Sequence, residues 1–282
     1  MFKSYINYIY ISLLIGLVLS PHFNVMAQDD VEMDNERYLN CIDLALSTPS
    51  LAEAIGKSWK NSGGGLPARH CVSLAQANMG QYEKAAIEFE AMARELLVSP
   101  NEDFAKLFSG NLKDLSGELL GQAGNVWLLA LKPNEAKNAF SKALEGLGNI
   151  PSLRIELYID RARASALLGE YEAAIEDLDL AQVEGPERPD IFVFKASAKR
   201  LLKKYGEAFS DVELALFRDP ENREGLLERG NLRRIKGDIK GAKDDWSYLI
   251  ALYPDSPSAK VAQKNINTLK AEEDFKVFPD NN

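Results

Sequence analysis

Between Ile155 and Pro254, apolar side chains recur at positions i, i+3, i+4 and i+7. This spacing places them on one face of an α-helix. Each pattern is interrupted once by a tight turn and ends at a proline, Pro186, Pro220 or Pro254, because proline cannot continue a helix. The pattern predicts three hairpins, each consisting of a helix, a turn and a second helix.

The three hairpins are copies of one unit. Their residues coincide at an interval of 34 positions, which indicates an internal repeat. Small residues at fixed places allow the two helices of a hairpin to approach closely. The positions in phase are Ala162, Ala196 and Gly230, then Ala174, Ala208 and Ala242, then Asp177, Asp211 and Asp245, and finally the three prolines.

This unit resembles the tetratricopeptide repeat, whose signature of small residue, glycine, tyrosine, alanine, aromatic residue, alanine and proline it carries. Trp246 takes the large core position of the third copy. The resemblance implies an all-α fold, an α-solenoid of helical hairpins with a C-terminal capping helix. Weaker copies are marked by Gly124, Trp127, Ala136, Phe140 and Ala143, and upstream by Gly80, Tyr82, Ala85 and Phe89.

The pattern and the resemblance together divide the whole chain. We expect a signal peptide at 1–27, a linker at 28–34, divergent N-terminal hairpins at 35–99, an insertion at 100–116, four repeat units at 117–150, 155–188, 189–222 and 223–256, a capping helix at 257–272 and a tail at 273–282.

Residues 1–27 have the pattern of a secretory signal peptide. Lys3 precedes an apolar core, YIYISLLIGLVL, which is short for a membrane span, and Val25-Met26-Ala27 offers small residues for a signal peptidase. We expect cleavage after Ala27 and a periplasmic or secreted protein of a Gram-negative bacterium. The alternative is an uncleaved membrane anchor.

The charge limits the classes of partner. The formal net charge is −9, and such a surface repels phosphate backbones and anionic lipids. We therefore expect no nucleic-acid binding and no stable membrane insertion after cleavage.

The residues that could carry chemistry are few. Beyond the leader, His70 is the single histidine, and no CxxC or HExxH spacing occurs. Because adjacent helical residues point about 100° apart, His70 and Cys71 do not form a nucleophilic pair. We predict a protein that is not an enzyme and holds no metal or cofactor.

Two cysteines in an exported chain predict one disulfide, Cys41–Cys71. In a stack that resembles tetratricopeptide repeats, these cysteines lie on neighbouring first helices, at a Cα separation of about 5–6 Å that suits a disulfide. The alternative is a thiol- or metal-handling protein that uses Cys41, Cys71 and His70.

The resemblance also implies where a partner binds. In such families the first helix of each unit lines a concave face that holds peptides or helices, so we predict a non-catalytic scaffold with a protein or peptide partner. Arg163, Arg200 and Arg234 form a basic strip suited to an acidic peptide, or they only solvate the inner face. The family's carboxylate-clamp residues are not reproduced. The matching positions are Asn125, Leu128, Leu129, Arg163, Phe194, Ser197, Arg200, Asn231 and Arg234.

A second ladder of charges predicts structural ion pairs. Basic residues recur at 161, 195 and 229 on the first helices, and Asp177, Asp211 and Asp245 recur on the second helices. Opposite charges in phase predict pairs between packed helices, which fix the register more than they stabilise the fold.

Overall fold

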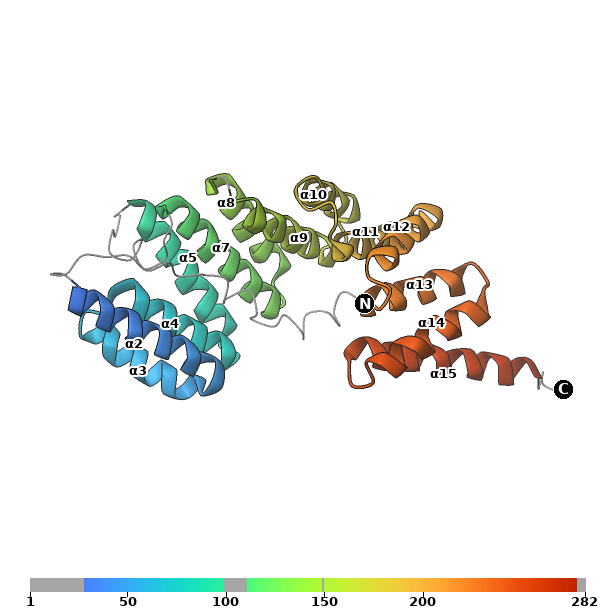
Figure 1. Ribbon diagram of the computed structural model, residues 1–282, viewed down its shortest axis with the longest axis horizontal. Helices are drawn as coiled ribbons and strands as arrows, with labels where there is room; N and C mark the ends of the chain where they lie inside the picture. Colours follow the sequence, from blue (N-terminus) through green and yellow to red (C-terminus); the bar gives the residue numbers. More distant parts are fainter. Residues whose placement is uncertain (1–27, 99–110, 149, 278–282) are drawn as a thin grey trace. The chain divides into compact units, whose positions relative to one another are not determined.

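In the computed structural model, which describes residues 28–98, 111–148 and 150–277, every regular element is an α-helix (Figure 1). The predicted all-α fold is confirmed: the described part of the chain contains 13 helices and no strand. None of these helices is long and apolar enough to cross a membrane. The chain divides into two units, residues 1–168 and residues 169–282.

Unit 1 is a stack in which each described helix packs against the next one. The core is continuous through the stack, and Phe89, Met92 and Phe140 are inaccessible to solvent. In addition, α2 packs against α4, and α7 packs against α9. The helices are α2 (Gln28–Ser47), α3 (Pro49–Asn61), α4 (Gly65–Asn78), α5 (Tyr82–Val98), α7 (Leu112–Leu129), α8 (Pro133–Gly146) and α9 (Pro151–Leu167).

Unit 2 holds α10 (Tyr171–Glu184), α11 (Pro189–Leu201), α12 (Tyr205–Arg218), α13 (Arg223–Ile235), α14 (Ile239–Leu252) and α15 (Pro257–Val277). Each helix packs against the next one along the chain. In addition, α13 contacts both α11 and α15. The capping helix covers the last hairpin, since Ala262 and Leu269 of α15 join the apolar cluster around Trp246.

The turn inside each hairpin needs a left-handed backbone. Gly169 and Gly237 have φ of 82° and 85°, values that glycine adopts without steric cost. Lys203 holds the same place in the middle repeat with φ of 62°. A residue with a Cβ is strained there by about 1 kcal/mol, so the packing of α11 against α12 holds the Lys203 turn in this conformation.

Close approach of the two helices explains two further glycines. A Cβ on Gly230 would lie 2.3 Å from Nε1 of Trp246, and one on Gly124 would lie 2.4 Å from the ring of Phe140. Where the first helix carries Ala196 instead, the residue 16 positions on is the smaller Val212. The size of the small residue therefore matches the side chain that faces it across the hairpin.

The predicted ladder of ion pairs forms only in part. Arg229 donates to both carboxylate oxygens of Asp245, at 3.0 and 2.7 Å, which confirms the pair in the last repeat. In the middle repeat the prediction is wrong. Lys195 pairs with Asp179 at 2.6 Å, and Asp211 pairs with Lys199 at 2.7 Å, because Lys199 projects from the next turn of the same helix.

Arg161 was expected to belong to the same ladder. Its guanidinium donates to Oγ of Ser141 at 3.2 Å, within unit 1.

Three predicted boundaries need correction. Residues 28–34 are not a linker, since α2 begins at Gln28. Likewise α7 begins at Leu112 inside the predicted insertion, because the side chain of Asn111 accepts a hydrogen bond from the backbone N–H of Asp114. The capping helix runs to Val277, beyond the predicted 272. The predicted leader and residues 99–110 and 278–282 lie outside the described residues.

Candidate protein-interaction surface

The predicted binding residues of unit 2 lie on α11 and α13. Together with α15 these form one layer, which we call the first-helix layer, in which α13 contacts both α11 and α15. The other helices of the unit, α10, α12 and α14, are the second helices of the hairpins.

Polar side chains join neighbouring helices of the first-helix layer. Nε of Arg200 on α11 donates to Oε1 of Glu228 on α13 at 2.5 Å. Nη2 of Arg234 on α13 donates to Oε1 of Glu272 on α15 at 3.0 Å. Asn231 accepts a hydrogen bond from Asn265 of α15, also at 3.0 Å. Arg200 therefore ties one repeat to the next, and Asn231 and Arg234 tie the last repeat to the capping helix.

The two arginines of this layer that were predicted to bind a partner, Arg200 and Arg234, differ in exposure. The side chain of Glu228 is 1% exposed and that of its partner Arg200 is 15% exposed. Arg234 is 38% exposed and its partner Glu272 is 50% exposed. Arg200 is therefore a largely enclosed cation that pairs with a buried acid, whereas Arg234 remains accessible to a partner. Ser197 is buried, and Phe194 is half-buried.

Unit 1 brings Asn125 and Arg163 together through an acid. Asp160 of α9 is buried, and its two carboxylate oxygens accept from Nδ2 of Asn125 at 2.9 Å and from Nη1 of Arg163 at 2.6 Å. Oδ1 of Asn125 is buried without a hydrogen-bond partner among the described residues.

Sequence reasoning missed the acids that engage these arginines. Asp160 and Glu228 occupy equivalent positions two repeats apart, and Phe194 occupies this position in the repeat between them. A search for acids recurring on the first helices would have found them. Whether the predicted residues bind a partner stays a prediction.

The predicted disulfide Cys41–Cys71 is present in the structure. Cys41 on α2 and Cys71 on α4 are joined, with Cα atoms 5.9 Å apart. Both are buried, and α2 packs against α4 as expected for neighbouring first helices. The bond ties the first hairpin to the second.

His70, on α4, lies in the interior of unit 1. Oε1 of Gln122 only accepts, so Nε2 of His70 donates to it at 2.8 Å, and Nδ1 then accepts from the hydroxyl of Tyr38 at 2.9 Å. The ring also meets Phe89 edge-on. Burial lowers the pKa of His70 from its usual 6.5 to about 4, and burial raises the pKa of Tyr38. This chain of hydrogen bonds joins α2, α4 and α7.

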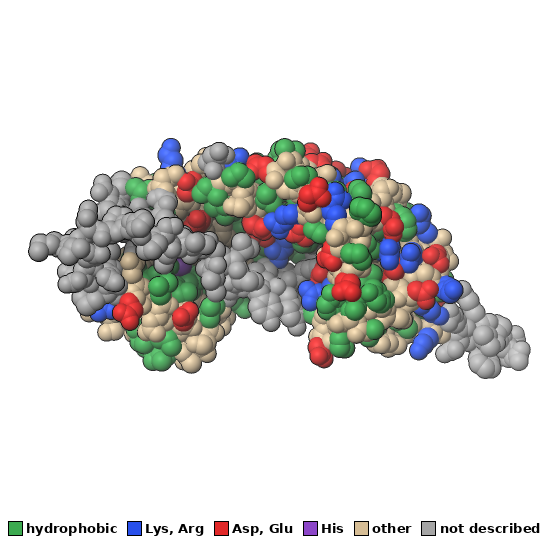
Figure 2. All heavy atoms as spheres, in the orientation of Figure 1, with side chains coloured by type: hydrophobic (Ala, Val, Ile, Leu, Met, Phe, Trp, Pro, Cys, Tyr) green, Lys and Arg blue, Asp and Glu red, His purple; other side chains and the backbone are tan. Residues whose placement is uncertain are grey.

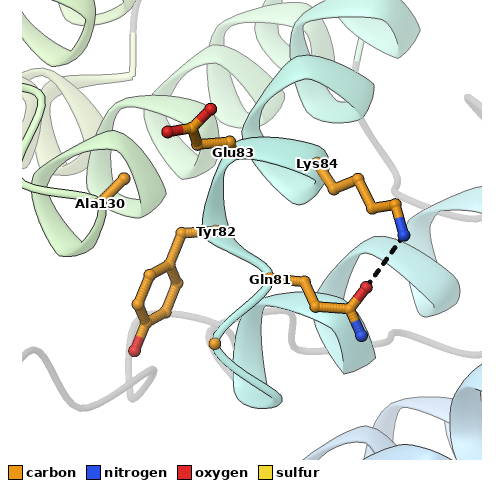
Figure 3. A pocket seen from close by; sticks show the side chains of 6 residues that line it. Gln81, Tyr82, Glu83, Lys84 and Ala130 are labelled. Carbon is orange, nitrogen blue, oxygen red and sulfur yellow. Dashed lines mark hydrogen bonds between the residues drawn. The ribbon is translucent and has the colours of Figure 1, made fainter.

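A shallow hollow lies at the turn between α4 and α5 (Figure 3). It measures about 410 Å³ and is lined by Tyr82, Glu83, Lys84 and Ala130 together with Gly80 and Gln81. Nζ of Lys84 donates to Oε1 of Gln81 at 3.1 Å. The hollow holds no nucleophile beside a base. In the described part of the chain, no cluster of three His, Cys, Asp or Glu is suited to a metal ion.

No protein-family model and no curated protein matches the chain. Among solved structures, it is similar to PilF of Pseudomonas aeruginosa, at 15% identity and a TM-score of 0.55, over 83% of this chain and 99% of that one. PilW, a widely conserved type IV pilus biogenesis factor, gives 19% identity and a TM-score of 0.55, over 82% and 98%. MamA gives 16% and 0.50, over 68% and 97%. These neighbours are tetratricopeptide-repeat solenoids. The chain has the tetratricopeptide-repeat fold.

The buried, hydrogen-bonded position of His70 predicts that the stability of the fold depends on pH. The unfolded imidazole takes up a proton below pH 6.5, whereas the folded one does so only near pH 4. Between pH 6.5 and about pH 4 the unfolded state binds more protons than the folded state. The contribution of neutral His70 to the free energy of unfolding is therefore fully present above pH 6.5 and is lost as the pH falls. We expect the free energy of unfolding to drop by about 2 kcal/mol between about pH 7.5 and pH 5.

Urea unfolding across this range measures the effect, and His70→Gln, which cannot titrate, should flatten the profile. The same slope in the variant as in the original chain would contradict this role for His70.

Proposed function

We propose that this chain is a non-catalytic protein-interaction scaffold of the bacterial periplasm that binds a peptide or protein partner on its first helices. The observation that carries the proposal is the first-helix layer of unit 2. Its helices lie side by side and present Asn231 and Arg234 at successive turns. In a repeat solenoid such a layer forms an extended surface that is not buried when the chain folds and so can bind a partner.

The proposed compartment is supported by two features. The disulfide Cys41–Cys71 is of a kind that persists in oxidising compartments such as the periplasm. Residues 1–27, outside the described residues, carry the signal-peptide pattern, so mass spectrometry of the exported protein should find Gln28 as its first residue.

The accessible charge suggests the chemistry of the partner. Because Arg200 is held by a buried acid, Arg234 is the more accessible of these two arginines, and its partner Glu272 is itself half exposed. A partner carboxylate can replace Glu272 at Arg234, while Asn231 supplies an amide beside it. We therefore propose a partner segment with an acidic residue.

Site-specific photo-cross-linking tests the proposal. A photoreactive residue at position 231 should yield a cross-linked adduct with a partner protein in intact envelopes. A photoreactive residue at position 57, on α3 in unit 1, is the control and should not. Introducing Arg234→Glu together with the probe at 231 should abolish the adduct, because the acidic partner is then repelled, while the helical circular dichroism signal stays unchanged.

Two results would contradict the proposal. One is an adduct from position 57 that equals the adduct from position 231. The other is an adduct that survives Arg234→Glu.

A further inference from the structure

The second helices of unit 2 expose apolar side chains in phase. Val183 on α10 and Phe217 on α12 occupy equivalent positions 34 residues apart, and they are 80% and 85% exposed. One turn earlier, Leu180, Leu214 and Tyr248 recur at the same interval on α10, α12 and α14, and all three are exposed. We call these five residues the second-helix stripe.

The fold does not require the stripe to be apolar. Ala181, Ala215 and Leu249, each one position on from a stripe residue, are fully buried and hold the helices in the stack. A Phe side chain that is almost fully exposed adds little to core stability. Single exposed apolar residues are ordinary, but a row repeated across three helices is typical of an interaction surface.

Side-chain hydrogen bonds join each of the later second helices to the preceding repeat. Nε of Arg218, beside Phe217 on α12, donates to Oε2 of Glu187 in the loop after α10, at 3.2 Å. The hydroxyl of Tyr248 on α14 donates to Oε1 of Glu221 in the loop after α12, at 3.5 Å. The end of each second helix therefore lies against the loop that leaves the preceding one.

The stripe is surrounded by negative charge. The exposed side chains of α10, α12 and α14 include six carboxylates and one lysine. Three of these carboxylates, on Asp179, Glu207 and Glu213, pair with cations of the first helices. The loops after these helices add Glu187, Glu221 and Asp255, which are exposed and again in phase. The C-terminal ends of all three helices contribute further negative potential. Apolar and acidic side chains lie next to one another over α10 in Figure 2.

This combination selects one kind of occupant. An anionic lipid surface and a nucleic acid are repelled, and a second copy of this chain would bring two acidic surfaces together. We propose that the second-helix stripe docks a basic amphipathic segment of another protein, whose apolar side chains cover the stripe while lysines or arginines meet the surrounding carboxylates. The stripe lies on α10, α12 and α14, so this site does not depend on the one proposed for the first-helix layer.

Binding of two synthetic helical peptides to the chain 28–282 tests the site. One carries a leucine face flanked by lysines, and the other has glutamate in place of each lysine. Fluorescence anisotropy should show binding of the lysine peptide that weakens with added salt, and no binding of the glutamate peptide. Leu214→Ser with Phe217→Ser should weaken binding at least about tenfold, which corresponds to 1.4 kcal/mol of lost apolar contact.

The matched control is Ile87→Ser on α5, which removes an exposed apolar residue outside the stripe and should leave the affinity unchanged. Equal binding by the original chain and the double variant would overturn the proposal, as would equal binding of both peptides. A dimer in analytical ultracentrifugation that the double variant abolishes would also overturn it, because the occupant would then be a second copy.

Discussion

Loss of the Cys41–Cys71 disulfide is expected to lower the free energy of unfolding by about 3.6 kcal/mol. The bond closes a loop of 30 residues, and a cross-link of that length restricts the unfolded chain by about this amount in the chain-entropy model. Both positions are buried, so Cys41→Ala with Cys71→Ala is preferable to serine, which would bury two hydroxyl groups. Denaturant unfolding of the chain 28–282 measures the difference.

Chemical reduction of the original chain provides the control. It opens the same loop without removing the sulfur atoms, so the difference between the reduced chain and the double variant measures the packing lost with them. Native-state hydrogen exchange should show faster exchange in α2 and α3, while α11 to α14 are unchanged, since repeat contacts join nearest neighbours. Equal stability of the oxidised and reduced chains would contradict this role for the bond.

Replacement of Arg200 by methionine is expected to destabilise the fold by about 3 kcal/mol at pH 7. The substitution removes the charge and keeps a long side chain, which leaves the carboxylate of Glu228 buried without its cation. An unpaired buried charge is far more costly than the loss of a surface pair. Chemical denaturation measures the change.

Arg234→Met is the matched control, because the Arg234–Glu272 pair is largely exposed and its loss should cost about 0.5 kcal/mol or less. Combining Arg200→Met with Glu228→Leu should recover most of the lost stability, since no charge is then left buried. Equal effects of Arg200→Met and Arg234→Met would mean that burial of Glu228 does not matter. For the same reason, Arg200 is unsuitable as a probe of partner binding.

The local pattern determined the architecture. Apolar spacing, prolines at the ends and the 34-residue interval sufficed to predict the hairpins from Ile155 to Pro254, because a helix buries one face and a repeat must bury the same face each time. Two cysteines and the resemblance sufficed for the disulfide. The start of α2, the start of α7 and the end of α15 were misplaced, because a helix can continue beyond its apolar pattern, as α7 does to the Asn111 cap.

Only the tertiary structure decided which side chains meet. Arg200 and Arg234 are 34 residues apart and equivalent in sequence, yet one pairs with a buried acid and the other with an exposed one. Lys195 and Asp211 occupy the positions expected to pair, yet each pairs with another residue, because a long lysine side chain can reach a different acid nearby. The periodicity that predicts core positions cannot show that Val183 and Phe217 face solvent. Burial depends on which helices pack against a face, and that is fixed by the whole stack.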